Sequence, residues 1–257
     1  MEEPAIFVWK HLWAGLYGGL LGLAMYLSAL GWQDGWALPR NDLLFLVAVA
    51  LQVAFLALHV ETPSEARALA AFGLMGLGME LFKVAEGSWS YEQEGVFMLG
   101  GVPLFVAFAY AAVPATIMRM LRLFDMRFAP FPPIWALSIL AAAIYLNFFT
   151  FHYTIDIRLV LFAATVLMFG RTWIWFRVGT GMYRMPMLVS LFGVALSMWL
   201  AENLGTLTGT WRYADQQMGE AVNLATMGSW FLMICVALAV VLLADRRFLS
   251  HIALARS

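Results

Sequence analysis

Apolar residues dominate this chain in long runs, and these runs define its predicted elements. Each run has about 20 residues, the length that a helix needs to cross the hydrocarbon core of a bilayer. The strict alternation of a membrane-spanning barrel strand is missing from them, so helices must satisfy the backbone polar groups in lipid. We therefore predict an all-α membrane protein. About eight transmembrane helices are expected, at residues 11–30, 43–60, 67–86, 97–119, 133–152, 157–176, 187–206 and 221–243.

Lysine and arginine residues indicate the orientation of these helices. The chain has 15 of them. With both termini in the cytoplasm, only Arg40, Lys83, Arg158 and Arg212 fall on the outer side, and the rest, Arg256 included, fall on the inner side. Cytoplasmic segments carry such an excess of positive charge. We therefore expect cytoplasmic termini and a multi-pass protein of the bacterial inner (cytoplasmic) membrane.

One motif occurs twice. The first copy runs from Glu80 to Tyr91 and the second from Glu202 to Tyr213, and both fit the pattern E-x6-G-[ST]-W-x-Y. The copies are 122 residues apart (80 to 202) in a chain of 257. A shared pattern at an offset of about half the chain indicates an internal duplication. We expect one integral membrane domain, 1–257, made of repeats at about 1–126 and 127–257. Each repeat would hold four helices with the same membrane sense, which makes them parallel repeats.

Composition narrows the class of protein and of partner. Hydrophobic residues make up 63% and charged residues 12% of the chain, against roughly half and a quarter in soluble domains. A net charge of -1 argues against nucleic acid as a partner. The single cysteine, Cys235, excludes an intramolecular disulfide and a cysteine-based zinc site.

Glu80 and Glu202 are the first candidates for chemistry. Each lies about 10 Å inside the outer end of its predicted helix, at 1.5 Å per residue. A carboxylate facing lipid at that depth is costly, so both are expected to face the interior. Two such groups in one cavity suit a division of roles into one acid and one base. The structural alternative pairs Glu80 with Lys83, and Glu202 with Asn203 or Arg212.

The aromatic residues of the motif form the second set of candidates, namely Trp89, Tyr91, Trp211 and Tyr213. Such rings are enriched at headgroup depth, and an anchoring role alone explains their position. It does not explain their fixed spacing from the carboxylates. An aromatic wall beside an acid suits an apolar, unsaturated or cationic guest. The other candidates for contact with a substrate are Lys83, Asn147 and Asn203.

His152 is the last residue of the fifth predicted helix, and Asp156 follows that helix on the outer side. If that helix continues through them, they are four residues apart and face one way. They are candidates for a proton relay or for metal ligation beside the glutamates. His152 is the only histidine expected on the outer side, which disfavours a zinc site with two or three histidines. We expect no metal and no cofactor.

Several segments resemble a family of uncharacterised bacterial integral membrane proteins. The segments are 78–91, 102–105, 119–124 and 147–149, with His152, Asp156 and 201–206. This resemblance covers almost the whole chain. It implies a multi-pass membrane protein and supplies no activity.

The first motif copy also resembles membrane-embedded carotenoid enzymes, namely heterodimeric-type lycopene cyclases and carotenoid hydratases. Gly87, Trp89 and Tyr91 are followed about ten residues later by Gly-Val-Pro-Leu at 101–104. The resemblance implies a lipid-dissolved polyene, protonated by a carboxylic acid at a terminal isoprene double bond and sheltered by aromatic faces. A base would then remove a proton, or water would add. The cyclases place acidic residues directly after the proline, whereas apolar residues follow it here, which favours hydration or a related addition over cyclisation.

Three functions stay open on this evidence. The first is an enzyme that does acid–base chemistry (hydration, cyclisation or isomerisation) on an apolar isoprenoid or other lipid. The second is a proton-coupled carrier for small solutes; the clustering of polar candidates toward one side counts against it. The third is a non-catalytic assembly protein, favoured if the carboxylates are salt-bridged with no cavity beside them. A membrane lipid or apolar small molecule is the expected partner, and a homo-oligomer stays open.

Overall fold

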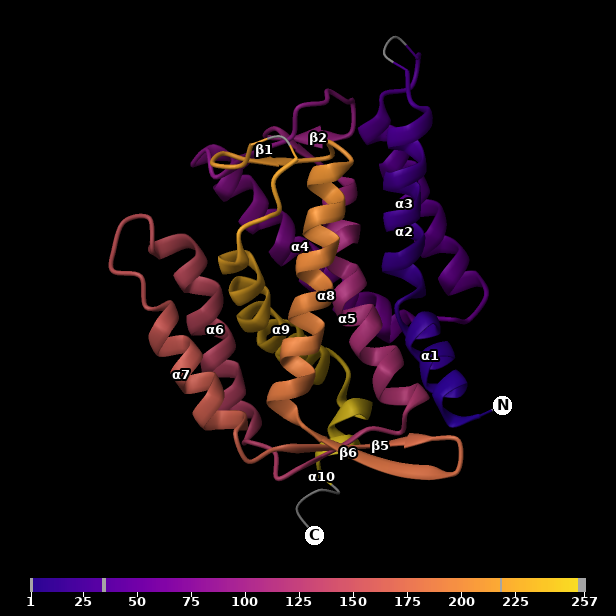
Figure 1. The fold of residues 1–257 in the computed structure, drawn as a ribbon, viewed down its shortest axis with the longest axis vertical. Coiled ribbons are helices and arrows are strands. Elements are labelled where there is room, and N and C mark those ends of the chain that lie inside the picture. Colours follow the sequence, from indigo (N-terminus) through magenta and orange to yellow (C-terminus); the bar gives the residue numbers. More distant parts are fainter. Residues whose placement is uncertain (1, 34–35, 218, 254–257) are drawn as a thin grey trace.

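The computed structural model describes residues 2–33, 36–217 and 219–253 and shows a helical bundle with short strands at its two ends (Figure 1). The helices are α1 (Glu3–Ala14), α2 (Leu16–Gly31), α3 (Arg40–Ala57), α4 (Pro63–Ala85), α5 (Phe105–Leu123), α6 (Ile134–Thr150), α7 (Arg158–Phe169), α8 (Met187–Leu207), α9 (Leu224–Ala244) and α10 (Ser250–Ala253), with a 3-10 turn, η1 (Arg246–Leu249). The strands are β1 (Trp89–Ser90), β2 (Met98–Leu99), β3 (Val102–Pro103), β4 (Arg127–Ala129), β5 (Trp173–Val178), β6 (Gly181–Pro186) and β7 (Arg212–Tyr213).

Among the described residues, five helices are long and apolar enough to cross a membrane by length and composition, namely α3, α4, α5, α8 and α9. Helices α1 and α2 meet at a bend of 69° and make a sixth if they form one broken span. The apolar helices α6 and α7 are shorter, with 17 and 12 residues. The chain is therefore a mostly helical membrane protein whose described residues contain five or six candidate spans by this measure, whereas the sequence predicts eight.

Helices α4, α5 and α9 form the centre of the bundle. Helix α5 packs along α4, and α9 contacts α4, α5, α6 and α8. The close approach of α4 and α5 requires a glycine, because a Cβ atom at Gly73 would lie 2.5 Å from the carbonyl oxygen of Ala107. Small residues serve the same purpose at other helix crossings in membranes. The site described below lies between these central helices and α6 and α8.

The strands lie at opposite ends of the bundle (Figure 1). At one end β4, β5 and β6 form an antiparallel sheet in that order, in contact with α1 and α10. At the other end β1 pairs with β7 and β2 pairs with β3. The first and last described helices therefore lie at the same end. Arg256, which the orientation argument counts, lies outside the described residues.

The predicted span 157–176 is wrong in its second half. Helix α7 ends at Phe169, and the apolar stretch that follows is strand β5. Buried and exposed residues alternate along it: Ile174 and Phe176 face inward, whereas Trp173 and Trp175 are exposed. This is the period of two expected of a strand with one covered face.

Two other predicted spans begin or break at different places. The predicted span 11–30 is interrupted at Gly15, between α1 and α2. The predicted span 97–119 begins as a helix only at Phe105, because 98–103 form the β2–β3 hairpin. Gly100 and Gly101 occupy the turn of this hairpin with φ values of 54° and 80°. Glycine adopts this left-handed conformation without steric cost.

Candidate functional site

Glu80 lies on the buried face of α4, and three neutral donors hold its carboxylate. Trp89 Nε1 donates to Oε2 at 2.6 Å, and Tyr91 Oη donates to the same oxygen at 2.8 Å. Tyr110 Oη, from α5, donates to Oε1 at 2.8 Å. Glu80 is only 5% exposed. Its carboxylate is therefore satisfied by hydrogen bonds without a cation.

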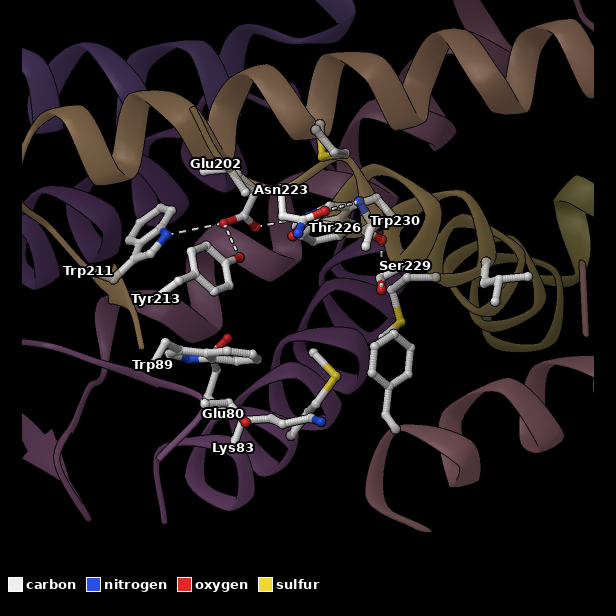
Figure 2. Close-up of a pocket in the computed structure, with 18 of the residues that line it drawn as sticks. Glu80, Lys83, Trp89, Glu202, Trp211, Tyr213, Asn223, Thr226, Ser229 and Trp230 are labelled. Carbon is white, nitrogen blue, oxygen red and sulfur yellow. Dashed lines mark hydrogen bonds between the residues drawn. The ribbon is translucent and has the colours of Figure 1, made fainter. Parts of the chain in front are cut away.

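Glu202 on α8 is held in the same way (Figure 2). Trp211 Nε1 and Tyr213 Oη donate to Oε2 at 3.1 and 2.8 Å. Trp230 Nε1, from α9, donates to Oε1 at 2.9 Å. In both copies of the motif, the Trp and the Tyr bind one carboxylate oxygen, and a residue from another helix binds the other. Among the described residues, neither glutamate takes part in an ion pair.

The two glycines of the motif explain how each chain segment returns to its glutamate. Gly87 and Gly209 have φ values of 70° and 61°, the left-handed conformation that ends many helices. The next residue, Ser88 or Thr210, donates its backbone N–H to the carbonyl five positions earlier at 2.9 Å in both copies. The chain therefore turns back at the helix end and places the Trp and the Tyr over the carboxylate.

Strands β1 and β7 join the two copies. They pair antiparallel, with Trp89 opposite Tyr213. The rings of these two residues lie edge to face with centroids 5.6 Å apart, and the rings of Tyr91 and Trp211 do so at 6.4 Å. Each aromatic residue thus contacts the other copy while it donates to its own glutamate.

Both glutamates line one cavity of about 560 Å³. Figure 2 shows Glu80 and Glu202 on opposite sides of it, with Trp89 and Tyr213 between them. Beyond Tyr110 on α5 and Trp230 on α9, further from the β1–β7 end, the walls are apolar. These walls include Val113, Ile144, Met198, Leu232 and Met233. The cavity has a size common for small-molecule sites.

Lys83 and Asn147 line the same cavity. Lys83 is 3% exposed, and its Nζ donates to Nε2 of His152 at 2.7 Å. Because an ammonium can only donate, this imidazole nitrogen accepts and His152 is neutral. Loss of hydration, together with the charge of Lys83, keeps the pKa of His152 below its ordinary value.

His152 and Asp156 do not share a helical face, contrary to the prediction. Helix α6 ends at Thr150, and both residues follow it in the connection to α7. Asp156 binds Arg158 at 2.6 Å and accepts from Asn147 Nδ2 at 3.3 Å. Burial raises the pKa of Asp156, but the hydrogen bonds from Arg158 and Asn147 and the charge of Arg158 together outweigh it and leave the pKa below its ordinary value. Arg158, Lys83 and Asn147 line the cavity, whereas His152 and Asp156 contact them from outside its lining.

Asn203 has a different position from the one predicted. Its Oδ1 accepts from the backbone N–H of Val222 at 2.9 Å, and its Nδ2 donates to the carbonyl of Trp199 at 2.7 Å. It fixes the segment before α9 and is not among the residues that line the cavity. The structural alternative for the glutamates is also wrong, since Lys83 binds His152 and Arg212 pairs with Glu92 at 3.0 Å.

Tyr110 and Trp230 were not found from the sequence, because they come from helices that carry no copy of the motif. An indirect signal for Tyr110 exists in a glycine near Glu80, and a glycine near Glu202 has the same relation to the motif residue Trp211. A Cβ atom at Gly76 would lie 2.2 Å from the ring of Tyr110, and one at Gly205 would lie 2.0 Å from the ring of Trp211. A glycine within one turn of each glutamate therefore leaves room for a large donor.

The catalytic and binding roles of the predicted residues stay predictions, as does the absence of a cofactor. Within residues 2–33, 36–217 and 219–253, no three His, Cys, Asp or Glu side chains gather closely enough to hold a metal ion.

Comparison with known proteins decides the family. A family model described as a protein of unknown function (DUF817) matches residues 3–238. The chain belongs to the DUF817 family. A Bacillus subtilis (strain 168) member of the curated proteins, described as uncharacterised protein YoaT, is 38% identical over 205 residues, which cover 79% of this chain and 78% of that protein. The expected membership of an uncharacterised bacterial family is thus confirmed.

The fold of this DUF817 protein is similar to that of a solved structure. A cross-linked MvINS trimer matches with a TM-score of 0.50 and 16% sequence identity, covering 72% of this chain and 97% of that chain. At this identity the similarity concerns the fold alone.

Proposed function

We propose that this DUF817 protein binds a lipid-soluble, unsaturated molecule inside the membrane and that Glu80 and Glu202 carry out acid–base chemistry on it. One observation carries the proposal. Both carboxylates are held by neutral donors, and both face one cavity of about 560 Å³. Intramembrane carboxylates are costly and are typical of functional sites.

The hydrogen bonds assign the free oxygen of each acid. Oε2 of each glutamate accepts two bonds, whereas Oε1 accepts one. A carboxylate oxygen has two lone pairs, so Oε1 has room for a proton or a substrate. We propose that the pair shares one proton, which makes one residue the acid and the other the base.

The proposed reaction is addition to a double bond or movement of that bond. The acid gives its proton to one carbon, and the Trp and Tyr rings beside it stabilise the positive charge on the other. Water then adds to that carbon and gives a proton to the carboxylate base, or the base removes a proton from a neighbouring carbon. In either case the pair ends with one proton, and no oxidant or reductant is needed.

A proton-coupled carrier is the second candidate, because the same cavity places two protonatable groups between central helices. The polar residues lie toward the β1–β7 end of the cavity, which favours the enzyme. An assembly role without chemistry was expected to show salt-bridged carboxylates with no cavity beside them, and neither feature applies to Glu80 or Glu202.

We also propose a topology of eight passes in two duplicated halves, with both termini in the cytoplasm and the β1–β7 end outside. The equivalent bonding of the two motif copies supports the duplication. The position of α1 and α10 at the same end of the bundle supports an even number of passes (Figure 1). The bacterial cytoplasmic membrane is the proposed location.

The test of the enzyme is to purify the protein in mild detergent and identify co-purifying organic molecules by mass spectrometry. We expect a lipid-soluble compound derived from an unsaturated substrate to co-purify with the wild type. We expect the unreacted substrate to co-purify with Glu80→Gln and with Glu202→Gln. Glu92→Gln is the matched control, since Glu92 pairs with Arg212 and is half exposed. Bulk phospholipid alone in all four samples would contradict the enzyme. Solute flux in vesicles under a pH gradient would then test the carrier.

A further inference from the structure

Lys83 is a buried cation whose charge is not balanced by a carboxylate. It is 3% exposed, and its Nζ contacts the neutral imidazole of His152 at 2.7 Å. Its Nζ also lies 3.8 Å from the centroid of the Phe151 ring. No described residue forms an ion pair with it. A buried charge without a partner is costly, so this position calls for an anion.

The charges around Lys83 do not supply that anion. Asp156 is occupied by Arg158 at 2.6 Å, and Glu86 accepts from Tyr153 Oη at 2.5 Å. Arg158 also lines the cavity, and its guanidinium carbon lies 5.1 Å from the centroid of the Phe151 ring, which Lys83 contacts as well. This part of the wall, formed by Lys83, Arg158 and Phe151, therefore carries two cations, of which Arg158 is paired with Asp156 and Lys83 with no carboxylate of the described residues.

The place of Lys83 along α4 sets the position of a bound anion relative to Glu80. Lys83 follows Glu80 by three residues, toward the β1–β7 end. Residues three apart on a helix have Cβ atoms about 5–6 Å from each other. The apolar walls lie on the other side of Glu80, deeper in the bundle. From that end inward, the cavity thus offers a cation, an acid and then an apolar space.

We propose that Lys83, with Arg158 beside it, binds the carboxylate or phosphate group of an amphipathic lipid whose chain fills the apolar part of the cavity. The ammonium has two N–H groups left after its bond to His152, which suits a two-oxygen acceptor. If Glu80 acts on this lipid, the reacting bond lies within a few atoms of the anionic group and not at the far end of the chain. This position of the reacting bond rests on the proposed function, whereas the anion site does not.

The test compares an acid with its neutral ester in the full-length protein, in nanodiscs of phosphatidylcholine. Dibromostearic acid and its methyl ester are suitable probes, because bromine quenches tryptophan fluorescence and Trp89, Trp211 and Trp230 line the cavity. We expect the wild type to bind the acid at least about tenfold more tightly than the ester. We expect Lys83→Met to lose this preference because it binds the acid more weakly and the ester equally well. We expect Lys83→Arg to keep the preference.

Lys10→Met is the matched control. Lys10 is the other lysine of the chain, and its Nζ donates to the carbonyl of Arg177 at 3.0 Å in an exposed contact at the opposite end of the bundle. This variant should keep the preference for the acid. Unchanged binding of the ester by Lys83→Met shows that the variant is folded. Equal binding of acid and ester by the wild type, or a preference that survives in Lys83→Met, would overturn the proposal.

Two further measurements complete the test. The first distinguishes a lipid from a small free anion, and the second distinguishes the anion site from the proposed enzyme. Inorganic phosphate at millimolar concentration should not displace the acid; displacement would mean that a small free anion is the ligand, which overturns the lipid assignment. Glu80→Gln should keep the preference for the acid, because it leaves Lys83 in place. If Glu80→Gln loses the chemistry and keeps the preference for the acid, the anion site and the chemistry depend on different residues. The preference then tests the anion site, and the chemistry tests the proposed enzyme.

Discussion

At the scale of single residues, indole and phenol groups replace cations as the partners of two glutamates in the bundle, Glu80 and Glu202. Trp89, Tyr91 and Tyr110 bind Glu80, and the second glutamate has the equivalent set. Neutral donors stabilise a carboxylate without fixing its charge by a permanent countercharge. The proposed proton exchange depends on this feature, because a buried pair with arginine favours the ionised carboxylate.

The fit of these donors can be tested at Gly205. A Cβ atom there would lie 2.0 Å from the ring of Trp211. We expect Gly205→Ala to displace the indole from Glu202 and to lower the free energy of unfolding by about 1–3 kcal/mol, the usual range for overpacking. Thermal unfolding in detergent, followed by tryptophan fluorescence, measures this.

Gly193→Ala in the same helix serves as its control. A Cβ atom at Gly193 meets no other atom within 4 Å. Alanine is a better helix former than glycine, so this variant should be as stable as the wild type or slightly more stable. Equal stability of Gly205→Ala and Gly193→Ala would show that the indole does not need this space.

The sequence predicts part of this site. The constant spacing of Glu80 to Trp89 and Tyr91, repeated at Glu202, marks residues that the structure brings together. Tyr110 and Trp230 could not be predicted, because their positions depend on how α5 and α9 pack against the motif helices. The position of Asn203 could not be predicted for the same reason, since a polar residue beside an acid can face a loop as well as a cavity.

At the scale of the elements, hydropathy found the central helices and missed the strands at their ends. Only Gly170, Arg171 and Thr172 separate α7 from strand β5. The strand is strongly apolar, because Trp173 and Trp175 on its exposed face are as apolar as Ile174 and Phe176 on its covered face. Only the alternation in burial separates this strand from a helix, and burial is not visible in a hydropathy average.

The junction between α9 and η1 gives a prediction about pH. Hydrogen bonds from Arg247 lower the pKa of Asp245 to about 2, against a burial effect in the other direction. Ser64 at the start of α4 also donates to Asp245, at 3.0 Å. A lowered pKa means that the ionised group stabilises the fold above pH of about 4, its unfolded value. This contribution is lost as the pH falls toward 2.

We therefore expect the wild type to be more stable than Asp245→Asn at pH 6 and to lose this advantage between pH 4 and pH 2, by about the amount that the pKa shift implies. Thermal unfolding of both proteins across this range measures the difference. Asp125→Asn is the control, because the pair of Asp125 with Arg127 is partly exposed and such pairs contribute little. A stability difference for Asp245→Asn that does not change with pH would contradict the assignment.

At the scale of the whole molecule, the two ends of the bundle should lie on opposite sides of the membrane. Val96 is 80% exposed near the β1–β7 end, and Met182 is 52% exposed in the sheet at the other end. With Cys235 replaced by alanine, Val96→Cys should react with a membrane-impermeant thiol reagent on intact cells. Met182→Cys should react only after the cells are opened. The reverse pattern would invert the proposed orientation.

The pairing of β1 with β7 also has a consequence for stoichiometry. A chain with two copies of one motif would ordinarily be expected to hold two ligands, one for each copy. Here the strands that carry the donors of Glu80 and of Glu202 are hydrogen-bonded to each other, above a single cavity. A movement of either strand disturbs the donors of both acids. The two copies of the motif therefore line one cavity, and we expect a titration to saturate at one ligand per chain.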